Sequence, residues 1–193
     1  MKGGSKRAMT VTSGSHSIGP ENGQLTVSTY VGGMGAKMGH DLVLQATRWS
    51  GTVNLDADNP AASSVQVTVD ADSLEVAQAS GGLKPLSDKD KGDIAQNQAK
   101  TLQTSKHPQI TFQSTAVTGN APKLSVQGNL TITGNTKPVT LDVTVDDAAG
   151  GTKVSGTTKL QHSDFGVKPY SKMGALKVKD EVDLQFVLTL PSA

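Results

Sequence analysis

The chain has 193 residues, a formal net charge of +1 and no cysteine. This length suits one domain with a sizeable core. The near balance of 18 basic and 17 acidic residues gives no electrostatic footprint for nucleic acid. The lack of cysteine excludes disulfides, thiolate metal sites and thiol nucleophiles.

The first residues differ in character from the rest of the chain. Residues 1–22 are rich in Gly, Ser, Lys and Thr and show no periodicity, which predicts a flexible N-terminal tail. A single domain is predicted over residues 23–193. Because the N-terminus has positive charge but no apolar signal-peptide segment, we expect a cytoplasmic protein, with periplasmic or secreted locations left open.

Most of the remaining chain alternates between apolar and polar residues, which is typical of half-buried β-strands. Gly134-Asn135 is typical of a tight hairpin connection. The predicted strands span residues 24–31, 42–48, 50–56, 63–70, 109–117, 123–133, 136–146, 153–161 and 181–190.

One segment near residues 88–104 favours a helix, because it lacks β-branched runs. Ser87 is a candidate N-cap, and Asp88 and Asp90 fall in the first turn, where carboxylates suit the helix dipole. His107-Pro108 is predicted to stop the helix. We expect this helix to lie on the sheet or near the mouth of a barrel. Its narrow inner face consists of Ile94, Gln98 and Leu102.

Many alternating strands in one chain predict a sandwich or a closed barrel. Hydrophobic residues make up 35% of the chain but aromatic residues only 3%, so aliphatic side chains would line the interior. A barrel lined in this way can enclose an apolar space, and such a space favours an apolar ligand.

Four stretches of the chain occur in the order and spacing of a known family. The resemblance is to the YceI-like family of lipid-binding proteins, and it implies an all-β fold, an extended lipocalin-like antiparallel β-barrel of about eight strands. It also implies an apolar tunnel that holds a polyisoprenoid, such as a polyprenyl phosphate or an isoprenoid quinone. The stretches are residues 49–53 with 63–74, residues 107–115, residues 126–141, and residues 163–166 with 180–182.

Candidate ligand-binding residues come from one alternate face of each strand, and a shift of one residue would select the opposite face. Met34 and Met38, in the Gly-rich segment 32–39, are predicted to reach over the mouth, since thioethers adapt to irregular apolar ligands. The strand candidates, with Phe165, are Leu42, Leu44, Val67, Phe112, Leu130, Ile132, Leu141, Phe165, Phe186 and Leu188.

Signals for catalysis or metal binding are weak. The four histidines lack the short spacing of zinc ligands, so no metal or other cofactor is predicted. No Gly-x-Ser-x-Gly nucleophile elbow occurs. Adjacent His40 and Asp41 would point to opposite faces of a strand. Four lysines form a candidate basic lip for a phosphate head group or a weak membrane-surface contact: Lys168, Lys172, Lys177 and Lys179.

Three functions follow from these patterns. The leading hypothesis is a non-enzymatic protein that sequesters a long-chain isoprenoid or related lipid inside the barrel. The alternative is a structural or protein-interaction barrel with a filled core and no ligand. A third is a hydrolase or isomerase that uses His40 or His162. An exposed barrel edge would also favour a homodimer, and no nucleic-acid partner is expected.

Overall fold

A computed structural model describes residues 13–33, 39–56, 58–148, 151–172 and 176–191. These residues form twelve strands, one α-helix and three 3-10 helices, which confirms the all-β prediction. The helices are α1 (Asp88–Thr101), η2 (Pro60–Ala62), η3 (Ala71–Ser73) and η4 (His162–Phe165). The strands are β1 (Gly14–Ile18), β2 (Gly23–Gly32), β3 (His40–Ala46), β4 (Trp49–Leu55), β5 (Ser64–Asp70), β6 (Leu74–Gly81), β7 (Gln109–Asn120), β8 (Lys123–Ile132), β9 (Asn135–Ala148), β10 (Gly151–Gln161), β11 (Ser171–Lys172) and β12 (Leu176–Pro191).

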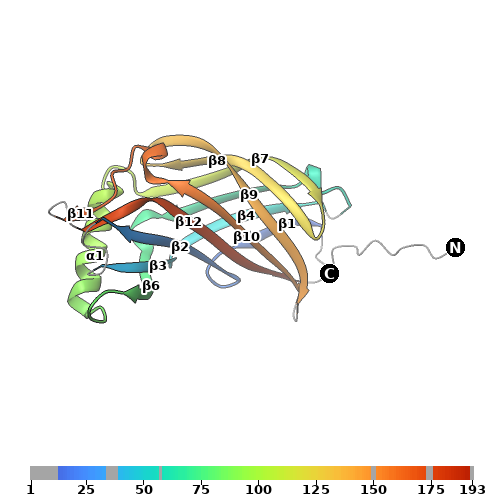
Figure 1. The fold of residues 1–193 in the computed structure, drawn as a ribbon. Helices are drawn as coiled ribbons and strands as arrows, with labels where there is room; N and C mark the ends of the chain where they lie inside the picture. Colours follow the sequence, from blue (N-terminus) through green and yellow to red (C-terminus); the bar gives the residue numbers. More distant parts are fainter. Residues whose placement is uncertain (1–12, 34–38, 57, 149–150, 173–175, 192–193) are drawn as a thin grey trace.

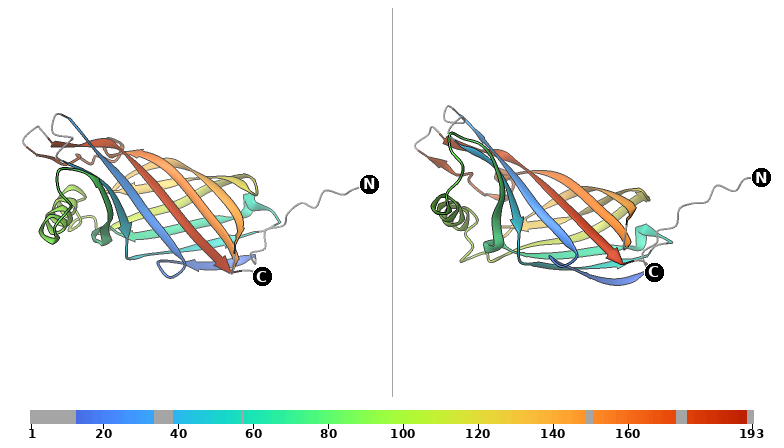
Figure 2. Two further views of the ribbon diagram at one scale, coloured as in Figure 1. Left: turned by 60° about the horizontal axis from the view of Figure 1, so that its bottom comes forward. Right: turned by 90° about the horizontal axis from the view of Figure 1, so that it is seen from below.

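All strands belong to one sheet in the order β1-β4-β5-β7-β8-β9-β10-β12-β2-β3-β6, with β11 paired to β12. Figure 1 shows that this sheet curls strongly into an elongated, barrel-like shell. The two further views in Figure 2, the right one from below, show the same curvature. Register shifts interrupt the β2–β12, β3–β6 and β7–β8 ladders. Such irregularities bend strands and add twist, which helps the sheet to curl.

The twelve strands exceed the nine ranges predicted from the sequence, and the barrel of about eight strands that the resemblance implies, because three strands lack a strong alternating pattern. β6 is largely exposed along its length, and β11 has two residues. β1 lies within residues 1–22, where the sequence predicts a flexible tail. Residues 14–18 instead pair with β4, and Ile18 is only 3% exposed. That part of the prediction is wrong, because pairing and burial of one isoleucine order a segment of otherwise small and polar residues.

Helix α1 has the predicted N-cap. The Ser87 hydroxyl accepts a hydrogen bond from the Asp90 backbone N–H at 3.1 Å, and the Ser87 N–H donates to the Asp90 carboxylate at 2.9 Å. These reciprocal bonds form a capping box. The helix ends at Thr101, earlier than predicted, because Gln103 adopts a φ of 49° that breaks the helical path.

The turn between β8 and β9 is hydrogen-bonded to η4. Thr133 and Gly134 both have positive φ, as a tight hairpin turn requires. The Thr133 hydroxyl and the Asn135 side-chain amide each donate to the Phe165 carbonyl at 2.7 Å. Phe165, the last residue of η4, is thereby held in the core at 1% exposure.

Two glycines in the wall of the barrel make room for phenylalanine rings. A Cβ added to Gly156 would lie 2.3 Å from the Phe186 ring, and one added to Gly128 would lie 2.4 Å from the Phe112 ring. Neither glycine has positive φ. Their role is therefore spatial: each ring packs onto bare backbone of a neighbouring strand.

Candidate functional site

The interior of the barrel contains a cavity of about 840 Å³. Two clusters of buried hydrophobic residues surround it, one around Phe112, Leu130 and Val182 and the other around Trp49 and Leu188. Every buried member of both clusters also lines the cavity. The core of this protein is therefore a wall around a lumen, and the cavity has the size of ordinary small-molecule sites.

The lining follows the alternation seen in the sequence. On β8, β9 and β12 every second side chain faces the lumen, as expected for a pleated strand. The lumen-facing positions are Leu124, Val126, Leu130 and Ile132 on β8, Val139, Leu141, Val143 and Val145 on β9, and Val182, Leu184, Phe186, Leu188 and Leu190 on β12. On β8 the missing member of the series is Gly128, whose place is taken by the ring of Phe112 from β7.

The structure places all ten of the described candidate residues on the lumen. They are Leu42, Leu44, Val67, Phe112, Leu130, Ile132, Leu141, Phe165, Phe186 and Leu188. Met34 and Met38 lie outside the described residues. The strand faces chosen from the sequence are thus the inner ones. Contact with a ligand is a separate matter and stays a prediction.

Several lining residues were not among the candidates. Trp49 begins β4, just after the β3–β4 turn, and its side chain is largely buried against the lumen. It was missed because it does not belong to a run of alternating apolar residues. The inner faces of β2 and β10 carry the same alternation as the chosen strands and could have been found from it. They contribute Leu25, Val27, Thr29, Val31, Val154 and Leu160.

Helix α1 contributes several polar residues to the lining. Figure 1 shows α1 at one end of the barrel, beside β6. The helix turns one face to the cavity, as predicted for Ile94, Gln98 and Leu102. The other lining residues of this face are polar: Asp90, Asp93, Asn97 and Thr101. Because Asp90 and Asp93 are also exposed to solvent, the cavity opens at this end.

His40 ties the loop before α1 to the sheet. Its Nε2 lies 2.8 Å from the Lys84 carbonyl oxygen, and its ring packs so closely on Gly82 that a Cβ there would lie 2.5 Å away. The loop residues Leu83 and Leu86 line the cavity mouth. His40 thus positions the mouth through a backbone carbonyl, and among the described residues no carboxylate is hydrogen-bonded to its ring as in a catalytic triad.

His162 also serves the structure of its surroundings. Its Nδ1 lies 2.9 Å from the Asp180 carbonyl oxygen. The Asp180 carboxylate accepts bonds from the Ser163 hydroxyl and from the Ser163 N–H, the latter at 2.7 Å. These two bonds, the hydroxyl first, hold the pKa of Asp180 below its usual value. Asp180 therefore connects β12, to which it belongs, to η4. No pattern in the sequence predicts this role.

Replacing Asp180 by asparagine is expected to lower the thermal unfolding midpoint at neutral pH. A carboxyl whose folded-state pKa is depressed stabilises the fold above its unfolded pKa, and this contribution is lost as the pH falls. The difference between wild type and Asp180→Asn should therefore shrink below the ordinary carboxyl pKa of 3.8. Thermal unfolding followed by circular dichroism across this range measures it.

Asp164, an exposed carboxylate of the same short helix, provides the control. Asp164→Asn should leave the midpoint nearly unchanged at every pH. A deficit for Asp180→Asn that stays constant down to strongly acidic pH would contradict the proposed role of the charged carboxylate.

Two negative findings apply to the described residues. They contain no group of three or more His, Asp or Glu side chains arranged to hold a metal ion. Within the same residues, no helix has both the length and the apolar character needed to span a bilayer.

Known proteins are similar to this chain in sequence. The chain is 35% identical over 126 residues to Protein YceI of Escherichia coli O157:H7, which covers 62% of this chain and 60% of that protein. A UPF0312 protein of Pseudomonas aeruginosa (strain LESB58) is 34% identical over the same coverage. The chain thus matches about 60% of the length of these relatives.

Solved structures show the same architecture. Burkholderia cenocepacia BcnA superposes with a TM-score of 0.67 at 23% identity, covering 86% of this chain and 94% of that one. A Campylobacter jejuni YceI protein gives a TM-score of 0.57 at 17% identity, with coverage of 80% and 84%. The model of the YceI-like domain matches residues 15–190. Because this match takes in nearly the whole barrel, the chain belongs to the YceI-like family.

Proposed function

We propose that this protein binds and sequesters a long-chain apolar lipid inside the barrel, with a polyisoprenoid as the ligand, and that it does so without catalysis. The cavity of about 840 Å³ carries this proposal. Its walls are the aliphatic inner faces of long antiparallel strands, and such walls offer an extended chain contacts along its whole length. A polyprenyl phosphate and an isoprenoid quinone are the two ligand types proposed.

The driving force is removal of apolar ligand surface from water. At ~25 cal/mol per Å², burying on the order of 400 Å² of a lipid chain contributes roughly 10 kcal/mol before ordering costs are subtracted. A barrel with a filled core would offer none of this. The lumen therefore favours the lipid-binding function over a purely structural barrel.

The mouth suits an amphipathic ligand. The lumen is aliphatic along the strands, whereas the α1 face presents Asn97, Gln98 and Thr101 to the same space. Buried polar groups of a ligand need hydrogen-bond partners. We therefore place the polar head of the ligand next to α1 and its hydrocarbon chain along the strands.

Trp49 provides a direct test, because it is the single tryptophan of the chain and lines the cavity. An isoprenoid quinone added to the purified protein is expected to quench its fluorescence saturably. The same quinone ring without an isoprenoid tail should not. Mass spectrometry of organic extracts from protein purified under native conditions should also reveal a long-chain lipid in near-stoichiometric amount. The proposal fails if no lipid is extracted and the tailed quinone quenches no better than the tailless one.

A further inference from the structure

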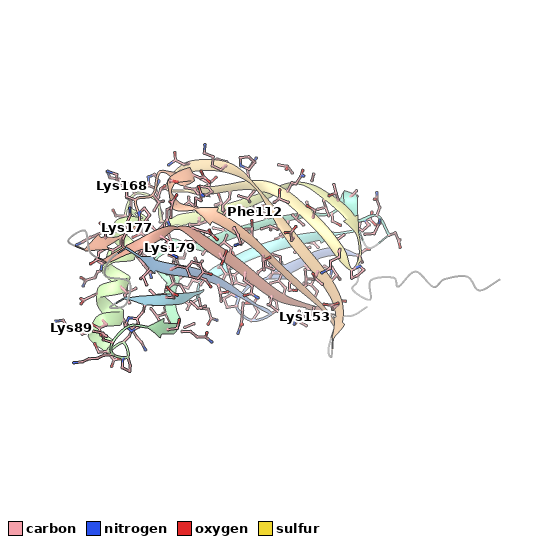
Figure 3. All side chains as sticks on the ribbon, in the orientation of Figure 1. Lys89, Phe112, Lys153, Lys168, Lys177 and Lys179 are labelled. Atoms are coloured by element: carbon pink, nitrogen blue, oxygen red, sulfur yellow. The ribbon has the colours of Figure 1, made fainter. Side chains whose placement is uncertain are left out.

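Exposed lysines gather at the α1 end of the barrel, around the mouth of the cavity. In Figure 3, Lys89, Lys168, Lys177 and Lys179 all lie at this end, whereas Lys153 lies at the other. The segment 168–179 contains four lysines and no acidic residue. The segment 168–179 is thus a basic stretch in a protein whose net charge is only +1.

Within the described part of the chain, no ion pair involves Lys89, Lys168, Lys177 or Lys179. The two ion pairs there join Arg48 to Asp70 and Lys159 to Glu181, at 3.0 and 3.1 Å. Nearby carboxylates are engaged inside the fold instead: Asp90 accepts the Ser87 N–H at the start of α1, and Asp180 accepts the two bonds from Ser163. None of these four ammonium groups is held in an ion pair with a described residue, and the charges of Asp90 and Asp180 act on Lys89 and Lys177 only over a longer distance.

A hydrophobic side chain projects from the same end. Leu83 is 74% exposed and is the one exposed large hydrophobic residue among those described. It sits in the loop that His40 ties to the sheet, and both Leu83 and Leu86 line the mouth of the cavity. An exposed leucine at the same end as lysines outside any ion pair is a composition that anchors proteins at the surface of anionic bilayers.

We propose that the α1 end of the barrel docks on an anionic lipid bilayer, with Leu83 inserted among the acyl chains and the lysines against the head groups. Charge complementarity selects this partner: the surface offers unpaired cations around an apolar tip. The purpose of docking rests on the proposed lipid-binding function, because it would bring the open mouth of the cavity to the membrane from which a lipid chain enters. The docking itself is independent of what the cavity holds.

Co-sedimentation with vesicles tests the proposal. The protein is expected to bind vesicles of phosphatidylglycerol, to bind vesicles of phosphatidylcholine much more weakly, and to lose binding at high salt. The variant Lys177→Gln/Lys179→Gln should bind phosphatidylglycerol about thirtyfold more weakly, from the contribution of each lysine near such a surface. Leu83→Ser should weaken binding about tenfold through loss of apolar insertion.

The matched control neutralises two lysines at the far end. Lys123 pairs with Thr144 and Lys153 with Asp146, so both lie on the same corner of the sheet, away from α1. Lys123→Gln/Lys153→Gln has the same net charge as the test variant and should bind phosphatidylglycerol vesicles like wild type. The docking proposal would be overturned by an equal loss of vesicle binding in the two double variants, by equal binding to both kinds of vesicle, or by no binding to phosphatidylglycerol.

A second readout separates docking from ligand binding. Quenching of Trp49 by the soluble isoprenoid quinone needs no vesicles, so it should be unchanged in Lys177→Gln/Lys179→Gln. If quenching is absent in all proteins while the vesicle results hold, the lipid-binding function fails and the docking surface stands. If quenching is normal and vesicle binding is absent, the docking proposal fails and the lipid-binding function stands.

Discussion

Replacing Leu141 by tryptophan is expected to remove lipid from the protein while making the protein more stable. Leu141 lies on β9 and faces the lumen, which holds no atoms of the protein itself. A larger apolar side chain fills part of that space, and cavity filling typically stabilises by about 1 kcal/mol. The same atoms occupy the path of a ligand chain, so we expect affinity for the isoprenoid to fall about tenfold or more.

The control lies one residue away on the same strand. Thr140 is exposed on the outer face of β9, so Thr140→Trp should change neither bound lipid nor lumen volume. Native mass spectrometry gives the lipid bound per protein, and urea unfolding of the delipidated proteins gives the stability. Full lipid occupancy in Leu141→Trp would show that the ligand does not use this part of the cavity.

The opposite signs of the two effects distinguish a functional lumen from a packing defect. Core substitutions that lower binding through damage to the fold also lower stability. A gain of stability joined to a loss of binding means that the space is maintained at the expense of the free energy of folding. Natural proteins carry such features at functional sites.

The strand pattern is predictable because it depends on a local property. A period of two in β8, β9 and β12 determines which side chains share a face, and burial of that face determines the inward direction. Alternation alone therefore suffices to assign Phe186 and Leu141 to the inner face, where both lie. The N-cap of α1 is equally local, since Ser87 and Asp90 form that motif within four residues.

Other features depend on contacts between distant segments, and no local pattern reports them. β1 forms because Gly14–Ile18 pairs with β4. Asp180 acts on Ser163 across 17 residues, and His40 meets the Lys84 carbonyl across 44. The mouth of the cavity is assembled from such contacts, so its shape is a property of the folded chain and not of any one segment.

The glycines of the barrel wall are a further feature of this kind. Read locally, Gly156 interrupts a strand and weakens it. In the fold it lies opposite Phe186, and the absence of a side chain at Gly156 leaves room for the Phe186 ring. We expect Gly156→Ala to destabilise the protein by about 2 kcal/mol, because the new methyl group overpacks the wall. The ring must then move toward the lumen, and lipid binding should weaken as well.

A double-mutant cycle isolates this effect. Phe186→Leu removes the ring that the Gly156→Ala methyl would meet, so the double variant should be less destabilised than the sum of the two single variants by about 1 kcal/mol. Gly92→Ala is the control for glycine replacement itself: nothing lies within 4 Å of a Cβ there, and α1 should gain about 1 kcal/mol in helix propensity. Urea unfolding of the wild type and of the four variants gives their stabilities.

Strict additivity in the cycle would mean that Gly156 is needed for its backbone and not for the space beside Phe186. The Asp142 carbonyl, 3.2 Å from the added Cβ, would then be the group that resists the substitution. Coupling, in contrast, would show that the lumen is kept open by seating aromatic rings on bare strands. In that case Phe112 and Phe186 contribute to the wall of the lumen by packing against the backbone of neighbouring strands, and they leave the space in the middle open.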